Sequence, residues 1–189
     1  MDQKREDRRI RITKMAIRES LIELMQELPI SKISVKMLCE TADINRSTFY
    51  AHYRDQYTLL KAVQQDTIAD LTKKIFSEQF FDASSNAVSV LVQILTYSKN
   101  NAPLFKVLLS EHGDSSFQDE LMQLAQEKII LEFRDKKTLP SHTMQYLKRF
   151  ILSGLLSITR HWLDENCKDE PEMLAELMIS LVVYGTNGL

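Results

Sequence analysis

Five residues between positions 46 and 52 carry side chains that could bind a nucleic acid duplex. They provide one guanidinium, two hydroxyls, one phenol and one imidazole, and they are Arg46, Ser47, Thr48, Tyr50 and His52. Groups of this kind bind phosphate oxygens and read base edges in a major groove. Arg46 is the best candidate for direct guanine readout, because its fork can reach two acceptors at once. We refer to these five residues as the DNA-facing set.

The surrounding stretch, residues 33–60, predicts two short helices joined by a tight turn and followed by a longer helix. Ser34 and Asn45 suit the N-terminal caps of the two short helices, and Asp55 suits that of the longer helix after them, because their side chains accept from free backbone N–H groups. The turn would need left-handed backbone at Asp43, a residue type that tolerates it. The apolar positions fall on the inner side: Val35, Leu38, Cys39, Ala42, Ile44 and Phe49. This pattern is typical of a helix–turn–helix whose second helix enters a major groove.

Basic residues are concentrated in the same part of the chain as the motif. Residues 1–54 hold 11 Lys and Arg against 8 Asp and Glu, whereas the whole chain has a net charge of −2. The basic charge therefore lies beside the helix–turn–helix pattern, where phosphate contact would need it. We expect phosphate contacts from some of the residues Arg8, Arg9, Arg11 and Lys14, and contacts to the DNA backbone from Thr13, Ser34 and Lys36.

The motif resembles the DNA-binding signature of the TetR/AcrR family of transcriptional regulators. The matching positions are residues 33–35, 38–39 and 42–53 in the motif, 13–17 and 22–25 upstream, and Leu59-Leu60 downstream. The resemblance covers about residues 7–62. It implies a three-helix DNA-binding domain that binds a double-stranded operator, in most members as a repressor released by an effector.

Apolar residues at helical spacing, such as Ile10, Ile17 and Leu21 along the inner face of the first helix, predict helices along the rest of the chain, and no strand pattern is present. We therefore expect an all-α fold with about nine helices. Outside the motif the expected helices are 7–28, 55–78, one ending near Asn100, a short one from Asn101 to about His112, 115–135, 142–166 and 171–185. We expect a DNA-binding domain over residues 1–54 and a helical effector-binding and dimerisation domain over residues 55–189.

The last two predicted helices are more apolar than one core-facing stripe requires, and Gly154 would permit close approach of a neighbouring helix. With their two-fold copies they would form a four-helix dimer interface that includes Leu155 and Leu181. A homodimer would also place two reading helices in successive major grooves. Ordinary core packing is the alternative interpretation of the same residues.

Residues 85–183 resemble the C-terminal domain of a Firmicutes-rich TetR branch that includes activators of dihydroxyacetone-kinase operons. The resemblance rests on residues 100–110, 113–117, Gly154 and Trp162. It implies an all-helical regulatory domain whose effector is an unknown small molecule or a partner protein. Six residues could line a pocket, although core packing is the commoner role of such residues: Tyr97, Phe105, Leu108, Tyr146, His161 and Trp162.

Other classes of function find little support. The four histidines form no HxxH or HExxH pair, and no GxSxG, phosphate-loop or dinucleotide motif occurs, so we expect no enzyme activity, metal or cofactor. Two isolated cysteines, the lack of an apolar signal segment and the lack of a membrane-spanning apolar run lead us to expect a cytoplasmic protein. The leading hypothesis is an effector-responsive repressor. The alternatives are an activator controlled by a partner protein and, more remotely, a helical enzyme or scaffold.

Overall fold

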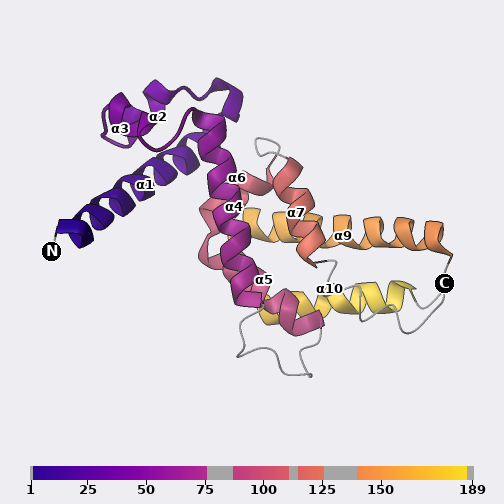
Figure 1. Cartoon of the computed structure of the whole chain (residues 1–189). Helices are drawn as coiled ribbons and strands as arrows, with labels where there is room; N and C mark the ends of the chain where they lie inside the picture. The colour runs from indigo at the N-terminus through magenta and orange to yellow at the C-terminus, as the bar shows by residue number, and fades with distance from the viewer. Residues whose placement is uncertain (1, 76–86, 111–114, 126–139, 187–189) are drawn as a thin grey trace. The chain divides into compact units, whose positions relative to one another are not determined.

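Helices are the only regular elements in the residues that this computed structural model describes, which are 2–75, 87–110, 115–125 and 140–186. In chain order they are α1 (Asp2–Glu27), the 3-10 helix η1 (Ile30–Lys32), α2 (Val35–Thr41), α3 (Arg46–Tyr50), α4 (Gln56–Ile75), α5 (Ala87–Asn100), α6 (Ala102–Leu109), α7 (Ser115–Ala125), α9 (Ser141–Asp164) and α10 (Pro171–Thr186) (Figure 1). The described ranges thus hold nine α-helices, and the predicted all-α fold class is confirmed. None of these helices combines the length and apolarity that crossing a bilayer requires.

Two helix boundaries differ from the predicted ones by more than two residues. α1 begins at Asp2 rather than Asp7, because the Gln, Lys, Arg and Glu residues between them favour helix and nothing there breaks it. α6 ends at Leu109 rather than near His112. There Ser110 turns back on the Val107 carbonyl, to which its N–H donates at 3.2 Å and its hydroxyl at 2.8 Å. The predicted extensions over residues 76–78 and 126–135 lie outside the described residues.

The chain divides into two compact units. The N-terminal unit comprises Met1–Thr67 with the segment that begins at Val107, and the C-terminal unit comprises Ile68–Lys106 with the chain from Ser115 onward. The division falls within α4 and within α6, so each of these helices contributes residues to both units. The predicted domain boundary after residue 54 separates residues by expected function, with DNA binding on one side and effector binding and dimerisation on the other. It stays a prediction.

The core of the N-terminal unit follows one face of α1. Ile17, Leu21 and Met25 recur every four residues along that face and are at most 1% exposed, as expected for the buried stripe of an amphipathic helix. α2 packs on α1 and α3 packs on α2, and they bring Leu38 and Phe49 into this core without any exposed surface. This packing fixes the base on which the short helix α3 presents its outer side chains.

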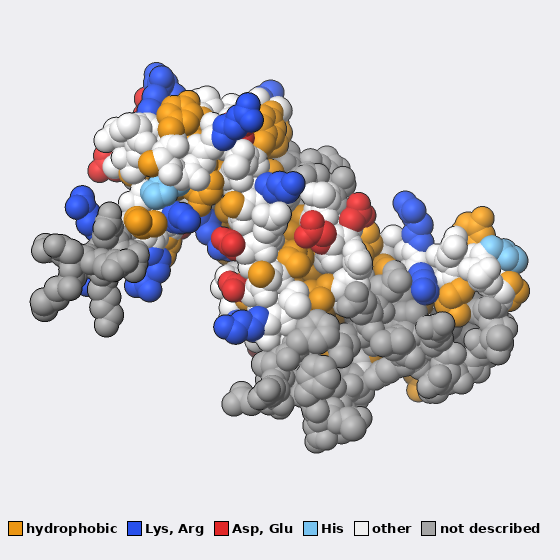
Figure 2. Space-filling view, in the orientation of Figure 1, with side chains coloured by type: hydrophobic (Ala, Val, Ile, Leu, Met, Phe, Trp, Pro, Cys, Tyr) orange, Lys and Arg blue, Asp and Glu red, His pale blue; other side chains and the backbone are white. Residues whose placement is uncertain are grey.

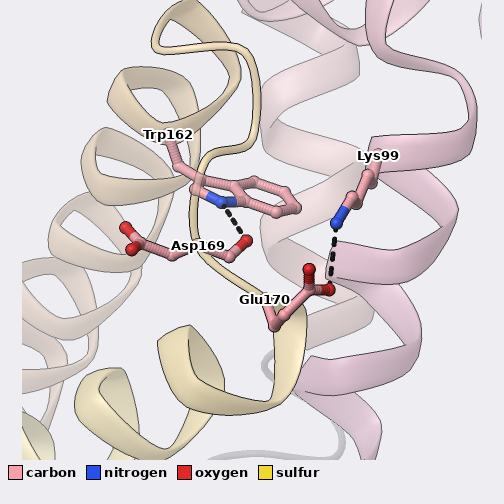
Figure 3. A network of polar contacts seen from close by, with 4 residues as sticks. All are labelled: Lys99, Trp162, Asp169 and Glu170. Carbon is pink, nitrogen blue, oxygen red and sulfur yellow. Dashed lines mark hydrogen bonds and ion pairs between the residues drawn. The ribbon is translucent and has the colours of Figure 1, made fainter.

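A network of polar contacts fastens the loop between α9 and α10 (Figure 3). The indole N–H of Trp162 donates to the backbone carbonyl of Asp169 at 3.0 Å, and Lys99 of α5 forms an ion pair with Glu170 at 3.0 Å. Asn166 adopts left-handed backbone with a φ of 58° in the same loop. α10 packs on α5, so the loop and the helix after it are both held against α5.

Three residues lie in surroundings that differ from the predicted ones. Ile10 was expected in the buried stripe of α1 but is 40% exposed, since that stripe begins at Ile17. A Cβ added at Gly154 would meet no atom within 4 Å, so no close helix approach among the described residues depends on this glycine. Leu155, expected at a dimer interface, is buried inside its own chain.

Candidate nucleic-acid interface and an apolar cavity

The turn between α2 and α3 has the geometry that the sequence predicted. Asp43 adopts a φ of 51°, and its backbone N–H donates to Glu40 while that of Ile44 donates to the Cys39 carbonyl at 3.0 Å. These two bonds are those of a Schellman motif, in which a left-handed residue ends a helix and satisfies its last carbonyls. The motif ends α2 and redirects the chain, so that α3 can begin at Arg46.

Asn45 organises the start of α3 beyond simple capping. Its side-chain oxygen accepts from the Thr48 backbone N–H at 2.8 Å, from the Thr48 hydroxyl at 2.8 Å and from the Ser47 hydroxyl at 2.6 Å. Each hydroxyl has a single proton to donate, so both are committed to Asn45 and their outward lone pairs can only accept. The predicted cap is confirmed, whereas the orientation of the two hydroxyls was not visible in the sequence.

The DNA-facing set lies on the outer side of α3 and just after it. Arg46, Ser47 and Tyr50 are exposed, and Thr48 and His52 are half-buried. The Tyr50 ring meets the buried Phe49 ring edge to face, with centroids 5.7 Å apart, so the tyrosine rests on the core although 56% of it is exposed. The structure therefore brings the five predicted side chains together. Their contacts with DNA stay a prediction.

The electrostatics around α3 suit an anionic ligand. Arg46 makes no ion pair among the described residues. Burial raises the pKa of the nearby Cys39 thiol above its usual value, and the charge of Arg46 is a smaller effect that opposes this rise. Figure 2 shows Lys and Arg side chains over the N-terminal helices, with acidic side chains sparse on the same face.

The three predicted flanking contacts occupy different settings. Ser34 caps α2 by accepting from the Met37 N–H at 3.2 Å, as expected. Lys36 is exposed and only loosely paired with Glu40, at 3.6 Å along the helix, so it remains available to a phosphate. Thr13 is half-buried on α1. Their role as contacts to the DNA backbone also stays a prediction.

Asp55 sits at the start of α4. Its carboxylate accepts from the Thr58 backbone N–H at 2.7 Å and from the Thr58 hydroxyl at 2.8 Å. These hydrogen bonds, the backbone one first, hold the pKa of Asp55 below its usual value. The predicted cap is confirmed, and it anchors the chain where α3 passes into α4.

An apolar cavity lies in the C-terminal unit between α5, α7 and α9. Its volume is about 450 Å³, counting the open space at its mouth, and its lining residues are Leu91, Ile94, Ser98, Leu121, Met122, Leu152, Leu155, Leu156 and Thr159. None of the six residues considered for a pocket lines it. Four of the six are buried elsewhere: Tyr97, Phe105, Leu108 and Trp162. The other two, Tyr146 and His161, are exposed. Each lining residue fits ordinary helix periodicity, so the sequence carried no signal for the cavity.

Residues 85–184 match the sequence model of the TetR transcriptional regulator C-terminal region, which is more than half of the chain. The chain belongs to the TetR family of transcriptional regulators. The helix–turn–helix of α2 and α3 and the all-helical C-terminal unit agree with that membership. No group of three or more His, Cys, Asp or Glu side chains in the described ranges is placed to hold a metal ion.

Relatives and solved structures place this TetR protein among helix–turn–helix regulators. The uncharacterised HTH-type regulator YxbF of Bacillus subtilis (strain 168) is 22% identical over 178 residues, which are 88% of this chain but only 43% of YxbF. The chain thus spans less than half the length of that curated relative. A TetR regulator structure from Streptococcus agalactiae 2603V is 29% identical, with a TM-score of 0.68 over 94% of this chain and 97% of that one. The dihydroxyacetone kinase operon activator DhaS shares the fold, with 20% identity, a TM-score of 0.59 and coverage of 93% and 96%.

Proposed function

We propose that this TetR protein is a sequence-specific DNA-binding regulator that acts as a homodimeric repressor under the control of an effector, and that it catalyses no reaction. The observation that carries the proposal is the outer face of α3. That face gathers an exposed Arg46, an exposed Tyr50 and two hydroxyls held by Asn45, on a short helix seated on the core. An α-helix so equipped can enter a major groove and read base edges.

The hydroxyl orientations refine what α3 would read. Phosphate oxygens only accept hydrogen bonds, so Ser47 and Thr48 could bind them only after releasing Asn45. Exocyclic amino groups of adenine and cytosine are donors in the major groove. We therefore assign Ser47 and Thr48 to amino groups of the bases and Arg46 to guanine, which leaves phosphate binding to Lys36 and the basic residues of α1.

The homodimer would form on the outer face of α10. Its inner face carries buried residues that pack on α5, including Leu174 and Met178. Its outer face carries a second apolar stripe that is about half exposed or more: Met173, Leu177, Leu181 and Tyr184. We call these four residues the exposed stripe. On α9, Tyr146 and Phe150 are 75% and 78% exposed. The large exposed apolar side chains on these two helices are more than the single scattered ones of an ordinary surface.

A second copy of the chain is the partner that fits the exposed stripe. A helix–turn–helix dimer places its two reading helices about 34 Å apart, on successive major grooves. A two-fold interface is self-complementary, so the same stripe serves both copies. Leu155 belongs to the wall of the cavity and Leu181 to this interface.

An effector in the C-terminal unit would change operator affinity through α4. This helix contributes to both compact units, with the division after Thr67. A ligand that biases the position of α4 would alter the spacing of the two reading helices. The coupling expected between two such sites is about 1–3 kcal/mol.

The decisive experiment selects duplexes from a random pool with the purified protein and measures affinity for the selected site. Arg46→Ala should cost about 1–3 kcal/mol and relax the preference at one base position. Arg149→Ala, which removes an exposed arginine from α9, is the matched control and should leave affinity unchanged. If the wild-type protein shows no salt-sensitive duplex binding, the helical enzyme or scaffold is the better hypothesis.

A reporter gene behind the selected site tests the sign of regulation. Repression predicts that expression rises when the regulator is deleted. A fall in expression would instead support the activator controlled by a partner protein.

A further inference from the structure

The wall of the cavity offers a ligand no free hydrogen-bond donor. Seven of its nine residues are apolar, and the other two are Ser98 and Thr159. The Ser98 hydroxyl donates to the Ile94 carbonyl at 2.8 Å, and the Thr159 hydroxyl donates to the Leu155 carbonyl at 2.8 Å. A strongly polar molecule would lose its hydrogen bonds to water here without replacement, so the wall selects an apolar body.

Two polar residues that do not themselves line the cavity lie on the same helix faces as parts of its wall. On α9, Arg160 follows the lining residue Leu156 by four positions, and on α7, Gln118 precedes the lining residue Met122 by four positions. Residues four apart share a helix face, so both side chains continue the rows that line the cavity. They also meet each other, because Arg160 Nη2 lies 3.5 Å from Gln118 Oε1. The two rows therefore end in the same polar contact.

Arg160 is poorly compensated at this position. Its Nε atom is buried and makes no hydrogen bond in the part of the chain that the structure describes. The contact with Gln118 lies at the outer limit of hydrogen-bond distance, and no carboxylate forms an ion pair with Arg160 in the same part of the chain. A buried donor without a partner is costly, most of all on a charged group. A ligand that brings an acceptor to this guanidinium would remove that cost.

We propose that the cavity binds an amphipathic carboxylic acid, with its apolar body between α5, α7 and α9 and its carboxylate on Arg160. A planar carboxylate matches the guanidinium fork and forms charge-assisted hydrogen bonds with it. The Ser98 and Thr159 hydroxyls, turned to their own backbones, leave the apolar body uninterrupted. This inference rests on the proposed effector control only for its consequence at the operator.

The binding experiment uses decanoic acid and its uncharged counterpart 1-decanol, each below its aggregation concentration, with the full chain. Trp162 is the only tryptophan of the sequence and lies two residues beyond Arg160, so its fluorescence reports binding, and calorimetry supplies the affinity. Wild-type protein should prefer the acid. Arg160→Met, which keeps an apolar stem, should weaken acid binding roughly tenfold or more and abolish the preference over the alcohol. Arg149→Met is the matched control and should behave as wild type.

Two further variants separate the carboxylate contact from general damage. Arg160→Lys keeps a charge but loses the fork, so it should retain part of the preference for the acid. Leu156→Phe enlarges a side chain of the cavity wall and should weaken acid and alcohol alike, while circular dichroism checks that each variant is folded. Equal affinity of wild type for acid and alcohol, unchanged acid binding in Arg160→Met, or binding of neither probe would overturn the proposal.

Operator titrations with and without decanoic acid distinguish this inference from the proposed function. Acid binding that depends on Arg160 but leaves operator affinity unchanged would support the ligand class and contradict effector control. Operator binding that persists while neither probe binds would retain the regulator and contradict the ligand class.

Discussion

The segment from Ser34 to Asp55 and the cavity between α5, α7 and α9 are built by interactions of very different range. In the first, Ser34, Asn45 and Asp55 each bond a residue two or three positions ahead. In the second, the polar end joins Arg160 to Gln118, which is 42 positions away. Short-range contacts set the turn before α3 and the first residues of this helix, and packing on α2 then seats it. The cavity exists only when three helices have packed.

On α3, the side chains that would bind DNA are not those that stabilise the fold. In the cavity, the same side chains would serve both purposes. The DNA-facing set lies outside the core, with Phe49 beneath it at 0% exposure, so outer side chains can be removed without opening the core. The cavity lining includes buried core residues such as Leu91 and Leu155. Truncating these would cost about 2–5 kcal/mol of folding free energy in addition to any effect on a ligand.

The largest effect on operator affinity is expected on the outer side of α3, where side chains can be removed without disturbing the core. Tyr50→Ala combined with Thr48→Ala should abolish specific operator binding, because it removes two base contacts of about 1–3 kcal/mol each at every half-site. Helicity and dimerisation should be nearly unchanged, since Tyr50 is 56% exposed. Fluorescence anisotropy with the selected duplex measures the affinity, and sedimentation checks the assembly. A double variant that selects the same sequence with unchanged affinity would show that α3 is not the reading helix.

The second effect concerns the exposed stripe of α10, a helix that depends, like the cavity, on packing with α5. Leu181→Glu should weaken the dimer by about 2–4 kcal/mol, because a half-exposed leucine is replaced by a charge at two symmetry-related positions. Ser180→Glu, at an exposed position of α10 outside the stripe, is the control and should have little effect. Analytical ultracentrifugation distinguishes the two. A monomeric wild-type protein would remove the basis of the two-half-site arrangement.

These two regions also explain how far the sequence could predict the structure. The three caps and the left-handed Asp43 follow from residue type and immediate neighbours, and all four are confirmed. The capping residues are polar and short, which restricts them to few local roles. The sequence therefore anticipated the backbone geometry of the helix–turn–helix segment, but not the contacts of the Ser47 and Thr48 hydroxyls with Asn45.

The sequence could not indicate which apolar residues of the C-terminal unit are core and which are surface. α10 has apolar residues on two faces, and only packing on α5 decides that Met178 is buried while Leu177 is 48% exposed. Leu155 was expected at an interface for the same reason and proved to be buried in its own chain. Periodicity gives the face of a helix but not the partner that covers it.

A smaller effect tests whether Asn45 positions the reading side chains or only caps α3. Asn45→Ala should cost about 0.5–2 kcal/mol of stability, which is typical for loss of a cap. It should also change base preference, because the Ser47 and Thr48 hydroxyls are then free to rotate and donate. Asp55→Ala removes the cap of α4 and serves as the matched control, with a comparable loss of stability and no change in preference. Identical selected sequences for wild type and Asn45→Ala would reduce Asn45 to a structural role.

The smallest effect is a pH dependence of stability that arises from the segment between Ser34 and Asp55. The pKa of Asp55 is held below its usual value in the folded protein, first by the Thr58 backbone N–H and then by the Thr58 hydroxyl. A carboxylate whose folded pKa is depressed stabilises the fold above its unfolded pKa of about 3.9, and this contribution is lost as the pH falls through the folded pKa.

The matched variants isolate this contribution from that of the other acidic residues. Asp55→Asn keeps a cap oxygen but cannot titrate, and Thr58→Val removes only the hydroxyl donor. We expect the difference in melting temperature between wild type and Asp55→Asn to favour wild type at pH 6 and to shrink steadily from about pH 4 downward. The difference in melting temperature between wild type and Thr58→Val should shrink less over the same pH range, because the backbone N–H, which this variant keeps, is the larger cause of the depressed pKa. A difference that stays constant from pH 6 to pH 3 would mean that charge adds nothing to this cap, and that the local region is held by hydrogen-bond geometry alone.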